Sequence, residues 1–294
     1  MRVCCRADGG HDVTRVLIVP NYSRADAVED AHKLEGFLCE KSVDVSLAPD
    51  RAARVDDVSA FDLVVSLGGD GTLLRAARIV TGADVPLLGV SYGHLGFLTC
   101  AEPKDLLTVV EDALEGRLHE SHRSTLDVNA EFIDADGVAF CAHKVALNDL
   151  ALGHGIRGDM ISFEVSVSGN HIDKLRGDGF VVSTATGSTG YALSAGGPIV
   201  TPEFEGMVCV PVAPHTIMAR AFLTGRDDEV RIEVDPERPA ETCVFADGQP
   251  LGAGCRLTRV SCRRGKHDLI LLNKSRESFY DSVSRVFYGK VAER

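Results

Sequence analysis

The chain has 294 residues, 45% of them hydrophobic, and a formal net charge of −12. That length is enough for two hydrophobic cores of modest size, so we expect two domains. An acidic surface repels nucleic acid and the anionic face of a membrane, so we expect neither as a partner. An anionic substrate needs a local cationic pocket within this acidic field.

Cysteine spacing and the first residues bear on the compartment. The nine cysteines include no Cys-x-x-Cys pair, which argues against structural zinc and favours small buried thiols in a reducing cytosol. Residues 1–11 lack the apolar segment of a secretory signal, and no apolar run approaches the ~18 residues of a membrane span. We therefore expect a soluble, cytoplasmic protein.

The first ~120 residues alternate between strand and helix patterns. The predicted strands are 14–19, 61–67 and 86–90, and the predicted helices are 26–41, 73–80 and 103–114. Alternation of this kind predicts an α/β layer with a parallel sheet. We assign this domain to residues 1–122.

From residue 123 to 276 the pattern changes to short β runs, which predicts a β-rich second domain. Turn signals, among them Asp136-Gly137 and Asp247-Gly248, separate the runs. The runs include 126–133, 138–152, 160–167, 180–183, 207–212, 230–234, 242–246 and 256–262. The last segment has apolar residues at helical spacing over 277–288, and we expect the tail 277–294 to pack back on the first domain.

The first motif is Gly68-Gly-Asp-Gly71, between a predicted strand and a predicted helix. Ligands bind at the carboxyl ends of strands in open α/β sheets, and a helix N-terminus there favours phosphate. A carboxylate beside phosphates needs compensation, so Asp70 either binds a metal or accepts a proton from an attacking hydroxyl. The alternative is that Asp70 is a helix N-cap, although Thr72 also suits that position.

The second motif is the stretch 176–198, in which Gly, Ser and Thr are dense and a Tyr follows. Its hydroxyl groups suit hydrogen bonds to ribose and phosphate oxygens, and its glycines allow close approach of the backbone. We predict a short helix at Thr189 to Ala195. An ordinary polar loop is the alternative, but such a composition is costly to order without a ligand.

Three shorter segments are weaker signals. Asn148 and Asp149 interrupt an apolar strand, where the pair either grips ribose hydroxyls or an adenine edge, or forms a bulge or turn. Phe97, after the third strand, either packs on a ligand ring or joins a core. Asp247-Gly248-Gln249 is by default a hairpin turn.

Gly153 to Gly158 matches the dinucleotide-binding pattern G-x-G-x-x-G, with Asp178 about 20 residues later. A strand pattern follows it instead of a helix, so the phosphate-binding helix N-terminus is missing, and we interpret the segment as a β-hairpin loop. No P-loop motif occurs in the chain.

Taken in order and spacing, these motifs resemble the NAD kinases. Gly-Gly-Asp-Gly alone is also shared with diacylglycerol and sphingosine kinases, but the block from Asp178 to Pro198 is specific. The resemblance spans about residues 63–249. It implies an N-terminal α/β domain, a C-terminal β-rich domain, and a homodimer or homotetramer.

The resemblance also implies roles for individual residues. Asp70 is expected to be catalytic. The expected contacts to NAD or ATP are Asp70, Gly71, Arg75, Phe97, Asn148, Asp149, Arg176, Asp178, Thr189, Gly190, Tyr191, Ala192, Leu193, Ser194 and Gln249. No residue is assigned as a metal ligand, because Mg²⁺ or Mn²⁺ is expected to arrive with the phosphoryl donor.

Three positions depart from the family pattern, namely Ser91 in place of Asn, Ala185 in place of Pro, and Gly190 in place of Ala. None removes the catalytic carboxylate. The implied reaction is attack of the 2′-hydroxyl of the adenosine ribose of NAD on the γ-phosphoryl group of ATP, with Asp70 as general base. A lipid or sugar kinase and a nucleotide-sensing protein without catalysis are the alternatives. The sequence leaves open whether polyphosphate replaces ATP and whether NADH is accepted.

Overall fold

The computed structural model describes residues 13–50, 55–93, 95–238, 240–275 and 278–289. The chain forms two compact units. One contains the residues up to His122 and those from Leu269 onward, and the other is Arg123–Asp268. The boundary at 276 that we expected from sequence lies beyond a strand, Leu269–Asn273, that belongs to the first unit. The predictions for residues 1–11 lie outside the described residues.

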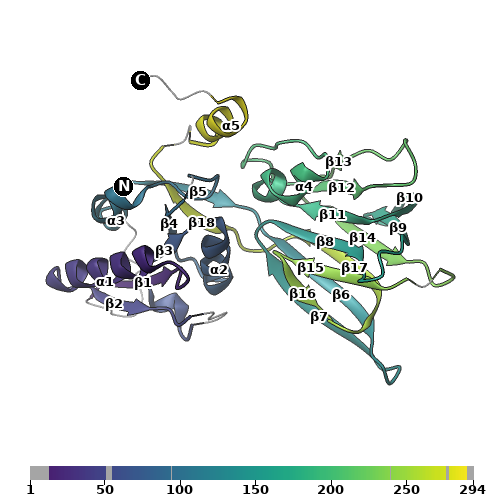
Figure 1. Cartoon of the computed structure of the whole chain (residues 1–294), viewed down its shortest axis with the longest axis horizontal. Helices are drawn as coiled ribbons and strands as arrows, with labels where there is room; N and C mark the ends of the chain where they lie inside the picture. The colour runs from purple at the N-terminus through teal and green to yellow at the C-terminus, as the bar shows by residue number, and fades with distance from the viewer. Residues whose placement is uncertain (1–12, 51–54, 94, 239, 276–277, 290–294) are drawn as a thin grey trace. The chain divides into compact units, whose positions relative to one another are not determined.

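A six-stranded sheet forms the centre of the first unit (Figure 1). Its strand order is β2-β1-β3-β4-β18-β5, and the pairs of β1 with β2 and β3, and of β4 with β3 and β18, are parallel. The strands are β1 (Arg15–Pro20), β2 (Asp44–Leu47), β3 (Leu63–Gly68), β4 (Leu87–Ser91), β5 (His119–Arg123) and β18 (Leu269–Asn273). The predicted parallel α/β layer is confirmed.

Helices cover both faces of this sheet. They are α1 (Ala25–Glu40), α2 (Asp70–Val80) and α3 (Leu106–Leu114), with short 3₁₀ turns η1 (Val58–Ala60) and η2 (Pro103–Asp105). A further helix, α5 (Ser278–Tyr288), follows β18 and is mostly exposed. The apolar stripe of α1 is buried with α3 against alternate strand residues, including Leu88 and Val90 of β4. Gly89 therefore faces the opposite side, where a Cβ atom would lie 2.4 Å from Leu73 of α2. The glycine makes room for α2 on that face.

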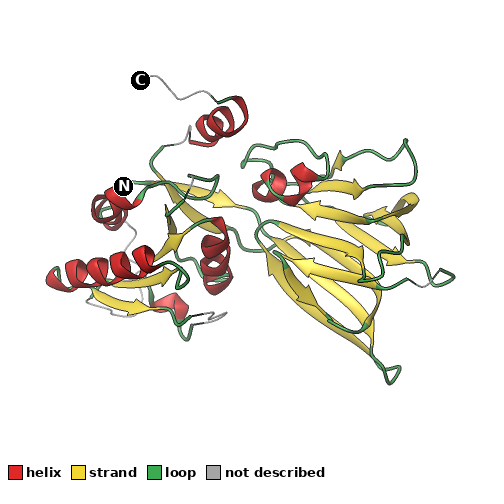
Figure 2. Cartoon of the chain, in the orientation of Figure 1, coloured by secondary structure: helices red, strands yellow, loops and turns green. Residues whose placement is uncertain are grey.

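The second unit is built almost entirely from strands, as Figure 2 shows. Two six-stranded sheets have the orders β10-β9-β14-β17-β6-β7 and β13-β12-β11-β8-β15-β16. The strands are β6 (Leu126–Ile133), β7 (Ala139–Ala146), β8 (Asp149–His154), β9 (Ile161–Val167), β10 (Asn170–Gly177), β11 (Gly179–Ser183), β12 (Val208–Val212), β13 (Phe222–Leu223), β14 (Glu229–Val234), β15 (Thr242–Ala246), β16 (Gln249–Leu251) and β17 (Arg256–Arg264). The neighbouring strands in both sheets pair antiparallel.

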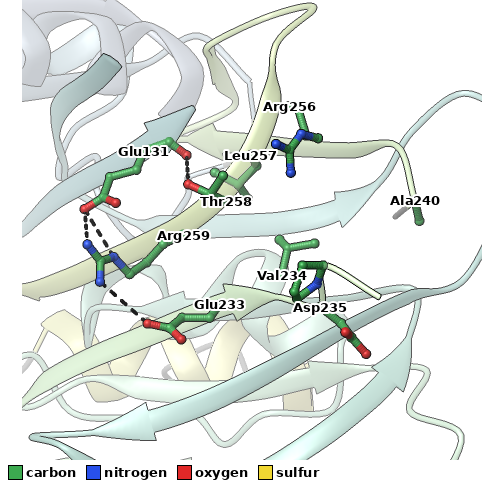
Figure 3. A pocket seen from close by; sticks show the side chains of 10 residues that line it. Glu131, Glu233, Val234, Asp235, Ala240, Arg256, Leu257, Thr258 and Arg259 are labelled. Carbon is green, nitrogen blue, oxygen red and sulfur yellow. Dashed lines mark hydrogen bonds and ion pairs between the residues drawn. The ribbon is translucent and has the colours of Figure 1, made fainter. Parts of the chain in front are cut away.

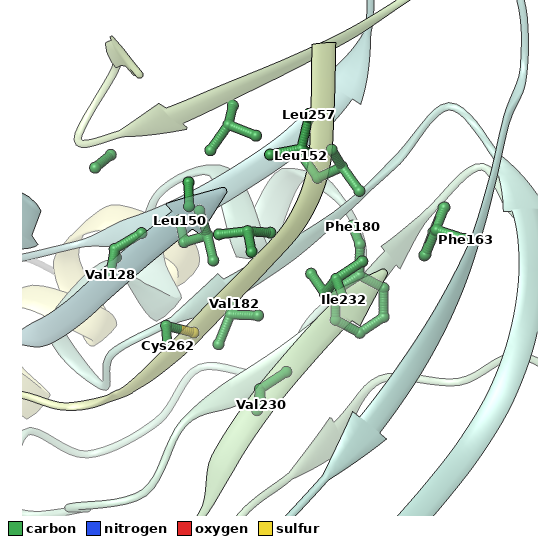
Figure 4. Close-up of a cluster of buried hydrophobic side chains, with 14 of the residues drawn as sticks. Val128, Leu150, Leu152, Phe163, Phe180, Val182, Val230, Ile232, Leu257 and Cys262 are labelled. Atoms are coloured by element: carbon green, nitrogen blue, oxygen red, sulfur yellow. The ribbon is translucent and has the colours of Figure 1, made fainter. Parts of the chain in front are cut away.

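The core of this unit lies between its two sheets (Figure 4). Phe163 of one sheet meets Phe180 of the other edge to face, with ring centroids 6.0 Å apart. Cys209 and Cys262 are buried in this core, but Cys39 and Cys141 are exposed, so the expected burial of the thiols holds for only some of them. The outer face of the second sheet carries a turn η3 (Thr186–Thr189) and a one-turn helix α4 (Tyr191–Ser194).

Turns and strand ends were predicted unevenly. The Asp247-Gly248 turn joins β15 to β16 with both residues at positive φ, 47° and 70°, as a two-residue hairpin requires. The interpretation of 153–158 as a hairpin loop was wrong, because β8 and β9 lie in different sheets. The predicted strand 138–152 is likewise two strands, β7 and β8, in different sheets. Both segments carry the chain from one sheet to the other, and the apolar pattern of a strand does not specify its sheet.

Candidate functional site

Asp70 is the first residue of α2 and is separated from β3 by Gly69. Gly69 occupies the N-cap position with extended backbone, and no side chain caps the helix there. Asp70 is therefore not the N-cap, which removes the structural alternative considered for it. Gly68 is required by packing, since a Cβ atom there would lie 2.2 Å from the Thr72 hydroxyl oxygen. Gly69 and Gly71 face open space, so packing within the described chain does not require them.

The Asp70 carboxylate lies against residues 95–98, which we call the carboxylate loop. A Cβ atom at Gly96 would be 2.5 Å and 2.6 Å from its two oxygens, so only glycine fits there. Asp70 as a residue is exposed, but its carboxyl group is partly enclosed on this side. This burial raises the pKa of Asp70, and a hydrogen bond from the backbone N–H of Leu98 opposes the shift. A carboxylate of raised pKa is a better proton acceptor than an ordinary one.

Two other candidates of the first unit are engaged by the protein itself. The Arg75 guanidinium donates to the carbonyl oxygen of Pro20 at 2.6 Å and lies 3.8 Å from the Asp50 carboxylate. It therefore links α2 to the carboxyl end of β1. The ring of Phe97 packs on Phe279 and Phe287 of α5, with centroids 6.1 Å and 5.8 Å apart. Of the two interpretations of Phe97, these contacts favour packing.

In the second unit, Asn148 and Asp149 form the corner at which the chain leaves β7 and enters β8. The Asp247 carboxylate accepts the backbone N–H groups of Leu147, Asn148 and Asp149 at 2.8, 2.7 and 3.2 Å. From the sequence we assigned Asp247 only to a turn. The available signal was an acidic residue before the Gly of a hairpin, together with the polar break in the apolar strand at Asn148 and Asp149. A turn residue thus holds the corner in place.

The two side chains of this corner are unusual for buried groups. Burial and the nearby charge of Asp247 raise the pKa of Asp149 to about 6. The side-chain oxygen of Asn148 is buried and has no hydrogen-bond partner in the described chain. Buried polar atoms are nearly always paired, so an unpaired one points to a missing partner. Both observations fit the predicted role of the pair in ligand binding.

The segment 176–198, which is rich in Ser and Thr hydroxyls, is hydrogen-bonded to the same corner. The hydroxyls of Ser183 and Thr184 donate to the carbonyls of Asn148 and Leu147 at 3.1 Å and 2.6 Å, and Ser188 donates to Ala185 at 2.7 Å. These hydroxyls were expected to bind ribose and phosphate, but they instead fold the segment against its own backbone. Thr186 differs, because its buried hydroxyl oxygen has no partner in the described chain. The short helix predicted at 189–195 is present as the one-turn helix α4 (Tyr191–Ser194), and η3 precedes it.

The remaining candidates of the second unit differ in their exposure to solvent. Arg176, Asp178, Gly190, Tyr191, Ser194 and Gln249 are exposed, Thr189 and Leu193 are half-buried, and Ala192 is buried. Ala192 packs in a small cluster with Ala185, one of the three departures from the family pattern. Gly190 has a negative φ of −99°, so its backbone does not demand glycine. Ser91 is buried at the end of β4.

Comparison with known proteins identifies the family of this chain. A model of the ATP-NAD kinase N-terminal domain matches residues 21–118, and a model of the ATP-NAD kinase C-terminal domain matches residues 147–272. The NAD kinase of Gemmatimonas aurantiaca is 42% identical over 196 residues, 67% of this chain and 66% of that protein. The NAD kinase of Cupriavidus pinatubonensis is 40% identical over 281 residues, 92% of this chain and 90% of that protein.

The chain belongs to the ATP-NAD kinase family. The fold agrees, since the crystal structure of yeast NADH kinase complexed with NADH matches it with a TM-score of 0.82. That match has 20% sequence identity and covers 96% of this chain and 89% of the yeast chain. The N-terminal match includes Asp70, and the C-terminal match includes the corner at Asn148 and Asp149.

A hollow in the second unit lies apart from the family motifs. It is lined by residues of β6, β14 and β17 and of the loop that follows β14 (Figure 3). Its charged groups largely pair with one another, as Arg259 does with Glu131 and, at 3.6 Å, with Glu233. Because these charged groups pair with one another, few of them are left to bind a nucleotide.

Two further findings concern metals and membranes. Within the described residues, no group of three or more His, Cys, Asp or Glu side chains is placed to hold a metal ion. In the same part of the chain, no helix has the length and apolar character needed to cross a membrane.

Proposed function

We propose that this protein is an NAD kinase that transfers the γ-phosphoryl group of ATP to the 2′-hydroxyl of the adenosine ribose of NAD, giving NADP. Membership of the ATP-NAD kinase family supports the substrates. The single observation that supports the chemistry is the setting of Asp70, whose carboxylate caps no helix and lies beside the open space at Gly69 and Gly71.

In this mechanism Asp70 accepts the proton of the 2′-hydroxyl as that oxygen attacks the γ-phosphorus. The bond from the γ-phosphorus to its bridging oxygen breaks, and ADP leaves with that oxygen. Contact with Gly96 and the N–H of Leu98 fixes the direction of the carboxylate. General-base assistance of this kind is worth ~10²–10⁴-fold in rate.

Mg²⁺ or Mn²⁺ is proposed to enter on the triphosphate as part of the substrate. On the triphosphate Mg²⁺ keeps phosphate oxygens and water as its ligands, so Asp70 is left free to accept the proton. When bound, the cation neutralises charge that develops on the transferred group.

The second unit supplies a setting for NAD in this proposal. The unpaired oxygen of Asn148 and the hydroxyl of Thr186 are each in need of a hydrogen-bond donor or acceptor. Asp149, Arg176, Asp178 and the segment 189–194 with Gln249 are the further proposed contacts. Ribose hydroxyls and an adenine edge present both donors and acceptors, which suits this mixture of groups.

The assay is formation of NADP from NAD and ATP by the purified protein, with diacylglycerol as a competing acceptor. NADP formation is the expected result. Phosphorylation of the lipid alone would identify the rival kinase, and binding of both nucleotides without product would identify a sensor. Either of these results contradicts the proposal.

Cytoplasmic location and a homodimer or homotetramer complete the proposal. Cys39, Cys100, Cys141, Cys209, Cys243, Cys255 and Cys262 are all free thiols, which suits a reducing compartment. The oligomeric state rests on the family resemblance alone. Light scattering at assay concentration tests it, and a fully active monomer would contradict it.

A further inference from the structure

The carboxylate loop contacts two partners at once. Gly96 and Leu98 lie against the Asp70 carboxylate, and the residues between and before them are attached to the C-terminal helix α5. Phe97 stacks on Phe287 with an interplanar angle of 29° and also meets Phe279 at 51°. The loop is therefore bound on one side by α5 and supports Asp70 with the other.

A second contact attaches the start of the loop to the same helix. The Arg285 guanidinium lies 3.4 Å from the carbonyl oxygen of Leu95 and donates to the Ser282 hydroxyl at 3.1 Å. Arg285 and Phe287 are two residues apart on α5, and their partners Leu95 and Phe97 are two residues apart on the loop. Within the loop, Gly96 donates its N–H to the Thr99 hydroxyl at 3.2 Å.

We infer that α5 is a positioning element for Asp70, which acts through Phe97 and Leu95 to hold the backbone of Gly96 and Leu98 against the carboxylate. Phe287 and Arg285 are its positioning residues, and neither touches Asp70 in the contacts described. The link from α5 to catalysis rests on the proposed function, whereas the link from α5 to the geometry of Asp70 does not.

The end of the loop is held by the rest of the first unit, since Leu98 is only 4% exposed and the Cys100 N–H donates to the Gly89 carbonyl at 3.0 Å. The start of the loop, at residues 95–97, is where α5 makes its contacts. Gly96 offers no side chain of its own to anchor the segment, so the aromatic cluster and the Leu95 carbonyl anchor it instead. Aromatic pairs of this kind stabilise a contact beyond the area that they bury. A misplacement of ~1 Å in a reacting group can cost about 10²-fold in rate, so a modest loosening of the loop suffices to be measured.

The test substitutes the positioning residue and a matched aromatic on the same helix. Phe287→Ala removes the ring stacked on Phe97, and Tyr288→Ala removes a neighbouring ring that is 71% exposed. Phe287→Tyr keeps a ring in place and serves as the conservative rescue. Phe287 is itself 40% exposed, so its removal is not expected to unfold the protein.

Three measurements are made on each variant. We expect kcat of Phe287→Ala to fall about tenfold, with the KM for ATP within about twofold, because the base is misplaced while the nucleotide is still bound. Amide hydrogen exchange in residues 95–99 should accelerate. The pKa of Asp70, followed by carboxyl NMR, should move down towards its ordinary value, because burial is the larger cause of its raised value. Phe287→Tyr and Tyr288→Ala should match the wild type in all three.

The outcomes separate the two proposals. Failure of the wild type to make NADP removes the proposed function, but exchange and the NMR titration still decide the role of α5. Wild-type exchange and Asp70 titration in Phe287→Ala would overturn the inference. A gain in activity or a lower KM for NAD would overturn it as well, since α5 would then be a cover over Phe97.

Discussion

Three aspartates in the motif segments occupy three different electrostatic settings. Asp247 accepts three backbone N–H groups, which is the arrangement that best stabilises a charged carboxylate. Asp149 is buried beside it and has a pKa raised to about 6. Asp70 is open to solvent on one side and enclosed by the carboxylate loop on the other. Residue type alone does not separate these settings, because each depends on the backbone brought next to the carboxylate.

Asp70→Asn tests the proposed base at constant size. Asparagine and aspartate rank close together as N-caps, and Asp70 is not the cap in any case, so the fold should tolerate the change. We expect kcat to fall by ~10²-fold or more, because the proton acceptor is lost. NAD affinity, measured by calorimetry, should be retained or slightly improved, since one negative charge near anionic substrates is gone.

The matched control for that experiment is Asp26→Asn. Asp26 is also an acid in the first turn of a helix, but its carboxylate pairs with Arg24 at 2.7 Å. Wild-type kcat is expected for this control. An Asp70→Asn enzyme within a few-fold of wild-type kcat would end the catalytic assignment of Asp70.

The raised pKa of Asp149 predicts a pH-dependent stability. A carboxyl group whose pKa is about 6 when folded and ordinarily 3.8 favours folding while it is protonated, so its contribution is full below pH 3.8 and is lost as pH rises through 6. The difference between a pKa of 3.8 and one of about 6 corresponds to at most ~3 kcal/mol. We expect Asp149→Asn to gain stability over the wild type by more at pH 8 than at pH 4, as measured by urea unfolding.

Asp159→Asn is the control for this titration, because Asp159 is an exposed acid in the following loop. Its unfolding free energy should follow the wild type at both pH values. If the Asp149→Asn difference is the same at pH 4 and pH 8, the carboxyl group does not titrate in the expected range.

At the scale of elements, the corner between β7 and β8 depends on a turn about 100 residues away in sequence. Asp247→Asn keeps a residue that tolerates positive φ, but it replaces one acceptor oxygen by an amide donor and removes the charge. One buried N–H of the corner then loses its partner, which costs ~1–3 kcal/mol. Chemical denaturation should show that loss of stability.

The turn between β6 and β7 provides the comparison. Asp136 also precedes a glycine at positive φ, but its side chain is exposed. Asp136→Asn should leave the unfolding free energy within about 0.5 kcal/mol of the wild type, as most surface substitutions do. Equal losses of unfolding free energy in Asp247→Asn and Asp136→Asn would show that the substitution disturbs the turn itself, and not the hydrogen bonds to the corner.

Helices and strands were predicted well where one regular spacing of apolar residues determines them. The stripe Ala27, Ala31, Leu34 and Leu38 is fully buried on α1, as helical spacing required. Sheet membership was not predicted, because β8 and β9 have similar apolar patterns and only their long-range partners differ. The strand Leu269–Asn273 was missed for the same reason, since its pairing with β4 spans about 180 residues of chain.

Prediction of the candidate site was similarly divided. Motif spacing identified Asp70 and the corner at Asn148, but it did not indicate what each side chain contacts. The hydroxyls of Ser183 and Thr184 can donate a hydrogen bond either to a ligand or to a backbone carbonyl. In the folded chain they donate to backbone carbonyls. Composition describes the donors available in a segment, whereas the partners depend on the tertiary fold.

At the scale of the whole molecule, the chain returns to its first unit after completing the second. β18 extends the parallel sheet and α5 contacts the carboxylate loop, so a segment late in the chain contributes to the unit that carries Asp70. A truncation near residue 268 would therefore remove part of the first unit, although that residue lies far from the family's Gly-Gly-Asp-Gly motif in sequence.

The whole-molecule charge supports a last prediction, dependence on a divalent cation. A protein of formal net charge −12 must bind ATP and NAD, both anionic, so part of the repulsion has to be offset at the site. Excess EDTA should abolish NADP formation, and Mg²⁺ or Mn²⁺ should restore it, because the cation enters on the triphosphate. The thermal unfolding midpoint serves as the control and should not change with EDTA, since a metal carried by the substrate does not hold the fold. Full activity in excess chelator would contradict the cation's role, and unfolding by EDTA would place the metal in the protein instead of on ATP.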